Sequence, residues 1–394
     1  MTTSEVSLRS VPRLTARSYA VEGGLDLLDR YTPGGFAWID GDHGFVASGV
    51  TAVVDPADAA SFLSAIRHRP ADAHVPPGAG PRAVGALPFT GSGQLVVPAV
   101  IVGRGADGRA WRTVVDDVDG PRPASSARLQ PVPSEFVVAT ATSREQWREM
   151  VEHALADIAR GRLEKIVLAR AVRIDADHPF DVPAVLAYLR RSQPGCIVYA
   201  DRGFLGASPE LLLRKVGATV TSRPLAGTNV ETAALVRSAK DAHEHGLVVD
   251  AVVRGLDTYC SDLRADGPSP LELADVTHLA TIVTARVDAA TTSIADLVAA
   301  LHPTPAVAGT PREVALDAIA ATEHVARGRY AGPCGWIDRH GDGEFVVALR
   351  GGEVDGTHAV IYAGAGIVAG SDPDAEWVET QQKFTPMLQA LVRP

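Results

Sequence analysis

The stretch SREQWREMVEHALADIARGRLEKIVLARAVRI, residues 143–174, changes its hydrophobic period part-way along, and this change decides the fold class. Ser143 followed by Gln146 has the form of a capping box, which marks the start of a helix. Gly161 stands where such a helix usually ends. In between, one apolar face recurs at helical spacing and predicts an amphipathic helix; it consists of Trp147, Val151, Leu155 and Ile158.

From residue 165 the period becomes two, which is typical of a strand with two distinct faces. One face is fully apolar, whereas the other begins with a lysine followed by small residues. The two faces are Ile166, Leu168, Val172 and Ile174 on one side and Lys165, Val167 and Ala169 on the other. The segment therefore predicts a helix followed directly by a long strand.

The same criteria predict further elements along the chain. Strands are expected at residues 44–54, 94–103, 196–201, 210–216, 335–338, 344–350 and 359–364, and helices at 238–259, 293–301 and 373–384. Pro386 should end or kink the last helix. Two stretches rich in Pro and Gly, 69–88 and 120–134, can be loops or boundaries. This order of elements predicts an α+β protein with much antiparallel pairing.

Composition excludes several classes of protein. Among the 394 residues, 46% are hydrophobic and 21% charged, as in soluble globular proteins. The net charge of −10 argues against a nucleic-acid binder. No apolar run reaches the roughly 18 residues of a membrane span, and the N-terminus lacks an apolar signal segment. Cys196, Cys260 and Cys334 form no CxxC pair and suggest reduced thiols, so we expect a cytoplasmic protein.

Acidic residues recur at helical spacing in two of the predicted helices. Asp241 and Glu244 share one face, and Glu376, Glu379 and Lys383 share another. One interpretation is two solvated helix faces with acidic residues near a helix N-terminus. The other is a pair of facing helices that hold a hard cation, because Mg²⁺ prefers carboxylate oxygen. Spacing alone leaves both interpretations open.

A series of segments, taken in order, resembles the chorismate-utilising enzymes. They are KIVLAR at 165–170, GASPELLL at 206–213, PLAGT at 224–228, KDAHEH at 240–245, VTHL at 276–279, LHPTPAVAG at 301–309, RGRYAG at 327–332, the segments 341–344 and 348–350, AGAGIV at 363–368 and EWVET at 376–380. Together they cover roughly residues 137–392, and so many ordered matches are far more specific than one motif. Before residue 135 the best matching fragment is GALPF at 85–89.

The resemblance implies one large α+β domain over residues 1–394, with two stacked, mainly antiparallel β-sheets and helices outside. Residues 1–135 would form a variable N-terminal part with Pro/Gly-rich loops, and residues 136–394 the chorismate-binding catalytic part. On this interpretation the two Pro/Gly-rich stretches are loops. Chorismate is the expected partner, without nucleic acid or membrane, and we expect a monomer as in many relatives.

The resemblance also implies the residues that act in catalysis. Making isochorismate requires water to add at ring carbon 2 while the hydroxyl on carbon 4 leaves. The resemblance assigns the base to Lys165 and the acid to Glu210. A base must be neutral and an acid protonated, so their surroundings must tune both groups. From position alone, Lys165 could instead be an exposed residue at a strand end and Glu210 a carboxylate at a strand edge.

Metal and substrate contacts follow from the same resemblance. Mg²⁺ would be bound directly by Glu244 and Glu379, and through water by Asp241 and Glu376. Two cations would hold the substrate's carboxylates, and glycines would let backbone approach the ligand. The expected substrate-binding residues are Gly227, Thr228, His278, Ala306, Tyr330, Arg350, Gly366 and Lys383, of which Arg350 and Lys383 are the cations. For His278, a structural core histidine is the alternative.

Single positions distinguish sister enzymes within the family. Ammonia-using relatives carry Gln where this chain has Lys165, and aminodeoxychorismate synthases tend to carry Lys where Ala226 stands. Salicylate synthases share the lysine and Tyr330 but typically have Thr in place of Ala306. The pattern favours an isochorismate synthase, an isomerase, with a salicylate synthase as the alternative. A non-catalytic chorismate-binding protein would be expected to lose Lys165 or Glu210; siderophore, salicylate and menaquinone biosynthesis all remain open as the pathway.

Overall fold

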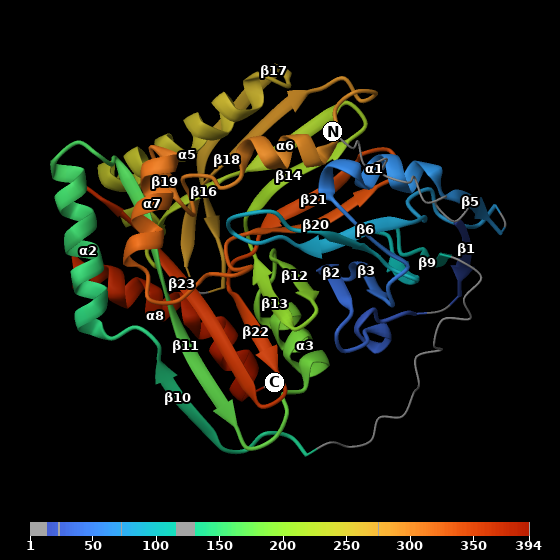
Figure 1. The fold of residues 1–394 in the computed structure, drawn as a ribbon, viewed down its shortest axis with the longest axis horizontal. Helices are drawn as coiled ribbons and strands as arrows, with labels where there is room; N and C mark the ends of the chain where they lie inside the picture. The colour runs from blue at the N-terminus through green and yellow to red at the C-terminus, as the bar shows by residue number, and fades with distance from the viewer. Residues whose placement is uncertain (1–13, 23, 72, 116–130, 275, 394) are drawn as a thin grey trace, which may run out of the picture.

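The computed structural model describes residues 14–22, 24–71, 73–115, 131–274 and 276–393. Its strands form two large sheets (Figure 1). Among the described residues, all neighbouring strands pair antiparallel except β1 (Thr15–Val21) and β5 (Arg67–Pro70), which are parallel. Buried clusters join the two sheets: Trp38 and Phe45 of one contact the same cluster as Val84 of the other. The expected α+β fold of two stacked, mainly antiparallel sheets is confirmed.

The first sheet has 13 strands. Its spatial order is β10 (Phe136–Thr140), β11 (Lys165–Ala176), β23 (His358–Val368), β22 (Gly351–Asp355), β13 (Phe204–Ser208), β12 (Ile197–Asp201), β2 (Phe36–Asp40), β3 (His43–Ser48), β8 (Val100–Arg104), β9 (Ala110–Val115), β1 and β5, and β19 (Gly309–Thr310) pairs with β11 outside this path.

The second sheet has 10 strands. Its order is β16 (Leu225–Asn229), β18 (Thr277–Arg286), β15 (Thr219–Arg223), β14 (Leu211–Val216), β21 (Gly343–Val347), β20 (Pro333–Asp338), β6 (Arg82–Ala86), β7 (Leu95–Val97) and β4 (Ala52–Val54), and β17 (Ser261–Glu272) pairs with β18.

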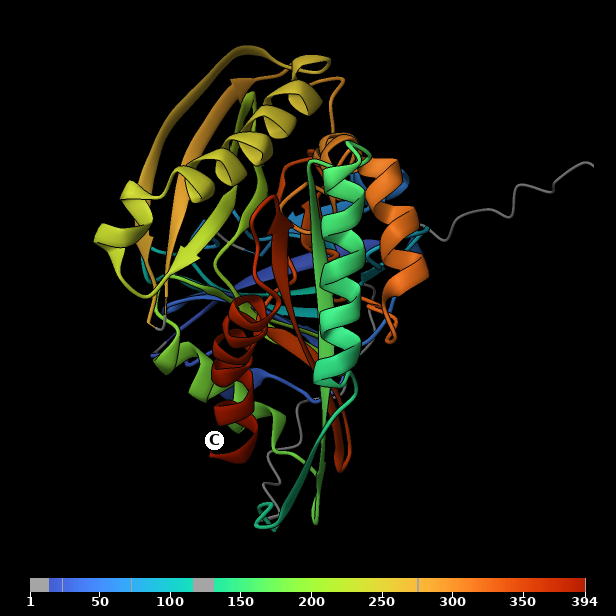
Figure 2. The same cartoon turned by 90° about the vertical axis from the view of Figure 1, so that its left-hand side faces the viewer.

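Helices cover the outer faces of the sheets, and Figure 2 shows α2 running along β11. None of the described helices is long and apolar enough to cross a membrane. The helices are α1 (Pro56–Ala65), α2 (Arg144–Ala159), α3 (Val182–Ser192), α4 (Thr232–Arg237), α5 (Ala239–Asp257), α6 (Ile294–Leu301), α7 (Arg312–Thr322) and α8 (Pro373–Val392), with a short 3₁₀ helix at Leu28–Arg30.

The helix and the strand predicted within residues 143–174 both form. The Gln146 N–H donates to Ser143 Oγ and the Ser143 N–H donates to Gln146 Oε1, so the capping box is confirmed. β11 begins at Lys165 and is buried along most of its length. On one face of β11, Lys165 and Val167 line a pocket. On the opposite face, Ile166 belongs to the hydrophobic core.

Other predictions were wrong. Residues 44–54 and 94–103 each hold two strands that belong to different sheets, and the chain crosses over near Gly49 (φ 71°) and Pro98. The Pro/Gly-rich stretch 69–88 contains the buried strand β6 and is not only a loop. Within the stretch 120–134, residues 120–130 lie outside the described residues. The predicted end of the last helix at residue 384 was also wrong, since α8 continues past Pro386 to Val392; the alternative of a kink at Pro386 stays a prediction.

Candidate active site

All fourteen residues predicted for the site line one pocket between the two sheets. The pocket holds about 860 Å³ of empty space, part of it open to solvent, which is the size of an ordinary small-molecule site. α5 and α8 contribute the four predicted metal ligands, β11 and β23 one wall, and β16 and β18 another. The structure thus brings the predicted residues together, while their roles remain predictions.

Lys165 lies at the inner end of the pocket. Its Nζ is 2.8 Å from Glu244 Oε1, and only 1% of its side chain is exposed, so the alternative of an exposed lysine is wrong. Burial alone raises the pKa of Glu244, but the charge and hydrogen bond of Lys165, together with the charges of Lys383 and Lys240, outweigh it and hold that pKa below its ordinary value. A Cβ at Gly366 would overlap Glu244 Oε1. A larger residue at this point of β23 would force the Glu244 carboxylate to move.

Glu210 lies immediately before β14 and is 3% exposed. Burial raises the pKa of its carboxyl to about 8, although Lys165 and a hydrogen bond from the Leu225 N–H act against this. Its backbone is fixed, because its N–H donates to Ser208 Oγ and its carbonyl accepts from the Val347 N–H. Glu210 is therefore a fixed carboxylic acid that holds its proton at neutral pH, and not an exposed strand-edge carboxylate.

Both α8 carboxylates of the pocket have lysine partners. Glu376 Oε1 is 3.0 Å from Lys240 Nζ, and Glu379 Oε1 is 2.6 Å from Lys383 Nζ. Lys383 also donates to the Gly364 carbonyl at 3.0 Å. Lys240 is a pocket residue that the sequence analysis did not assign, although it immediately precedes Asp241 in a matched motif.

The carboxylates on the two helices also affect one another. Burial, and then repulsion from Glu244 and Glu379, raises the pKa of Asp241, and burial with repulsion from Glu379 raises that of Glu376. Glu244 and Glu376 are buried, which contradicts two merely solvated faces. In the described part of the chain, no three His, Cys, Asp or Glu side chains already converge as an ion would require. Crowded, oxygen-only carboxylates nevertheless fit a hard divalent cation, which would relieve their repulsion.

His278 connects Arg350 to the turn at Gly227. Arg350 Nη2 donates to His278 Nε2 at 3.1 Å, so the ring proton lies on Nδ1, which faces the Gly227 carbonyl at 3.1 Å and Thr228 Oγ1 at 3.0 Å. Burial, together with the charge of Arg350, lowers the pKa of His278 well below its ordinary value, which keeps the ring neutral. His278 thus lines the pocket and is a buried histidine with hydrogen-bond partners, while its contact with the substrate stays a prediction.

Backbone geometry at this end of the pocket is unusual. Arg350 has φ of 49°, a left-handed conformation that a non-glycine residue keeps only where its surroundings enforce it. Gly227 has φ of 74°, and a Cβ there would lie 2.9 Å from Asp241 Cβ. The irregular part of β16 that carries Gly227 can therefore approach α5 only because this residue is glycine.

Tyrosines form the remaining wall. The Tyr330 ring stacks on Tyr362 with centroids 5.2 Å apart and planes at 16°, and both line the pocket with Ala306. Burial raises the pKa of Tyr330 to about 12, so it stays a neutral hydroxyl. Tyr362 and Arg327 were not predicted; Arg327 opens the matched segment 327–332, which was the available signal.

Comparison with known proteins identifies the family. Residues 109–392 match the family model described as chorismate binding enzyme. The chain belongs to the chorismate-binding enzymes. Isochorismate synthase DhbC of Bacillus subtilis is 34% identical over 93% of this chain and 95% of its own length. Isochorismate synthase MenF of the same organism is 35% identical over 76% of this chain and 69% of its own length.

A solved structure extends this similarity to the fold. The menaquinone-specific isochorismate synthase MenF of Escherichia coli superposes with a TM-score of 0.82 at 27% identity and covers 96% of this chain and 95% of its own. The similarity to chorismate-binding enzymes thus includes the described N-terminal strands, which precede the region matched by the family model.

Proposed function

We propose that this chorismate-binding enzyme is an isochorismate synthase, an isomerase that adds water at ring carbon 2 of chorismate and removes the hydroxyl of carbon 4. One observation carries the proposal: a buried lysine and a buried glutamic acid with a pKa of about 8, Lys165 and Glu210, line the same pocket. A base and an acid in one pocket suit this reaction, because it takes a proton from the water that attacks carbon 2 and gives a proton to the hydroxyl that leaves carbon 4.

The proton balance of the reaction assigns one task to each group. Lys165, as the neutral amine, accepts a proton from the attacking water, whose oxygen bonds to carbon 2. The two ring double bonds shift, the carbon 4–oxygen bond breaks, and Glu210 protonates the departing hydroxyl, which leaves as water. Before the reaction the Lys165 ammonium, which pairs with Glu244 at 2.8 Å, must lose its proton to water. Each step is reversible, so the enzyme should catalyse both directions.

Cations of the pocket support the binding of a substrate with two carboxylates. Arg350 is oriented by His278, and Lys383 by Glu379 and the Gly364 carbonyl. A guanidinium can bind a carboxylate through two parallel hydrogen bonds, whereas an ammonium acts as a point charge. These local charges offset the net charge of −10, which by itself would repel an anionic substrate.

The proposal includes Mg²⁺ as cofactor. Glu244 and Glu379 would bind it directly, and Asp241 and Glu376 through water. When bound, it supplies positive charge for the ring carboxylate of chorismate. The crowded carboxylates of α5 and α8 support this assignment. We also infer a monomer in the cytoplasm, which gel filtration at micromolar concentration tests for the oligomeric state.

Product analysis tests the proposed reaction. With chorismate and Mg²⁺, the enzyme should yield a mixture of chorismate and isochorismate without stoichiometric pyruvate, because Ala306 lacks the hydroxyl that salicylate synthases typically place beside the ring. A pyruvate-coupled assay measures this, with free isochorismate as the control for spontaneous decay. Pyruvate released as fast as chorismate disappears would identify a salicylate synthase, in agreement with Tyr330.

A further inference from the structure

A segment of the N-terminal part extends from the second sheet to the back of the pocket. β6 pairs with β20, and the chain continues beyond β6 through Leu87–Phe89, which lies before the region matched by the family model. The Leu87 N–H donates to the Pro333 carbonyl at 2.7 Å, and the Phe89 N–H to the Gly328 carbonyl at 2.8 Å. A Cβ at Gly332 would overlap the Leu87 carbonyl oxygen. The segment is thus fixed against the chain that carries Tyr330.

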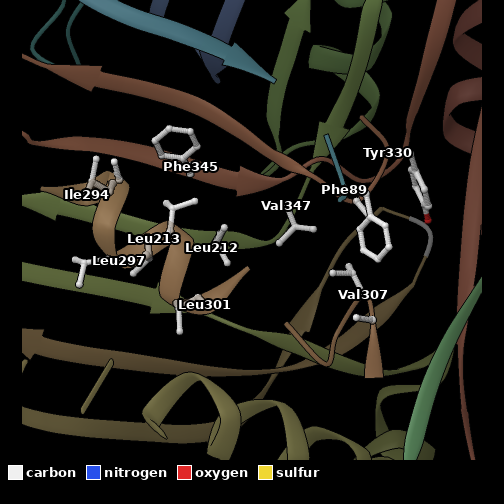
Figure 3. Close-up of a cluster of buried hydrophobic side chains, with 14 of the residues drawn as sticks. Phe89, Leu212, Leu213, Ile294, Leu297, Leu301, Val307, Tyr330, Phe345 and Val347 are labelled. Carbon is white, nitrogen blue, oxygen red and sulfur yellow. The ribbon is translucent and has the colours of Figure 1, made fainter. Parts of the chain in front are cut away.

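Phe89 is the last residue of this segment, and its side chain lies in the hydrophobic core next to the pocket residue Arg327. Phe89 is 4% exposed, and the Arg327 guanidinium lies over its ring, 4.2 Å from the centroid. The His302 ring contacts it edge-on at 6.1 Å, and His302 Nε2 lies 2.9 Å from the Phe89 carbonyl. Figure 3 shows Phe89 with Val307 and Tyr330 at one end of a buried cluster. Phe89 itself does not line the pocket.

Arg327, on which Phe89 packs, joins two walls of the pocket. Its Nη1 donates to the Val307 carbonyl and its Nη2 to the Val167 carbonyl, each at 2.7 Å. Glu323 pairs with the same guanidinium and accepts from the Ala169 N–H. These bonds hold β11, which begins at Lys165, against the loop that carries Ala306. Because Glu323 compensates its charge, Arg327 is suited to fix the walls and not to bind a substrate carboxylate.

We propose that Phe89 is a positioning residue for the substrate pocket. Its ring supports the Arg327 guanidinium from behind, and Arg327 in turn sets the distance between the Lys165 strand and the Ala306 loop. Cation–π contact with an aromatic face supplies this support, and an aliphatic side chain cannot replace it. The N-terminal part therefore helps to shape the pocket although none of its described residues lines it. This inference rests on chorismate being the ligand, as proposed above.

Replacing Phe89 by Leu tests the inference, with Phe345→Leu as the matched control. Phe345 is 1% exposed in the same buried cluster, at the other end of it in Figure 3, and does not line the pocket. Both variants should lower the melting temperature. Only Phe89→Leu should raise KM for chorismate at least fivefold, with kcat changed less than threefold. If Phe89→Leu does not fold, Phe89→Met is judged by the same criteria.

Binding without turnover separates this inference from the proposed reaction. In a Lys165→Ala background, calorimetry with chorismate and Mg²⁺ should show a Kd at least fivefold higher with Phe89→Leu than without it. If the parent enzyme binds chorismate but does not convert it, the proposed reaction fails and the Kd still tests Phe89. A KM and Kd within twofold of the parent, or an equal rise in Phe345→Leu, would overturn the positioning role.

Discussion

Glu210→Gln should remove activity and, at alkaline pH, stabilise the protein. The amide preserves the shape of the side chain but has no proton to give to the departing hydroxyl. Turnover should therefore fall by about 10²-fold or more, the ordinary contribution of a general acid. In the parent enzyme, kcat/KM should decline as pH rises through about 8, because the carboxyl of Glu210 then loses the proton that it must donate.

The pKa of Glu210 sets the size of the stability effect. The unfolded chain loses this proton near pH 4.5 and the folded chain near pH 8, so folding becomes less favourable throughout that interval. The whole interval corresponds to roughly 5 kcal/mol at about 1.4 kcal/mol per pH unit. Gln carries no charge that burial could penalise. Between pH 5 and pH 9, the free energy of unfolding of the variant relative to the parent should thus rise by roughly 4 kcal/mol.

Urea unfolding of both proteins at pH 5 and pH 9 measures this change. Any pH-independent effect of the amide cancels in the comparison between the two pH values. A variant that keeps turnover within tenfold of the parent would refute Glu210 as the acid. A stability difference that is the same at pH 5 and pH 9 would refute the raised pKa of its carboxyl.

The remaining predictions concern the base and the metal. Lys165→Ala should abolish turnover but leave the Kd for chorismate within a few-fold, because a base acts in the transition state more than in binding; turnover within about tenfold of the parent would refute it. EDTA should remove activity and Mg²⁺ restore it, whereas Zn²⁺ should substitute poorly for an oxygen-only site. Glu244→Ala and Glu379→Ala should weaken Mg²⁺ binding in calorimetry at least tenfold, and full activity in metal-free buffer would show that no cofactor is needed.

The sequence correctly predicted those helices and strands along which hydrophobic residues recur with one constant period. The capping box at Ser143 and the alternation from Lys165 correctly gave α2, β11 and the face of β11 that reaches the pocket. The single strand predicted at residues 44–54 was wrong because apolar residues continue on both sides of Gly49, where the chain passes from one sheet to the other. β6 was missed because Pro and Gly surround it, although all of its residues are buried. Where the chain passes from one sheet to the other depends on contacts between distant residues, which a short stretch of sequence does not reveal.

For the site, helical spacing correctly placed Asp241 with Glu244 and Glu376 with Glu379, since residues three apart share a helix face. Spacing could not reveal which partners would face them. The pairs of Glu244 with Lys165 and of Glu376 with Lys240 join elements far apart in the chain, whereas Glu379 and Lys383 lie four residues apart on α8. The support of Arg327 by Phe89 was equally hidden, because the two residues are separated by most of the chain and meet only in the fold.

The most direct test of the central claim is to run the reaction in H₂¹⁸O with chorismate and Mg²⁺ and to analyse the products by mass spectrometry. Water as nucleophile, activated by Lys165, predicts isochorismate with one ¹⁸O at ring carbon 2. Chorismate recovered after equilibration should carry ¹⁸O at carbon 4, because the reverse reaction adds water there. Isochorismate without label would mean that the hydroxyl moves within the substrate, which would contradict the roles proposed for Lys165 and Glu210.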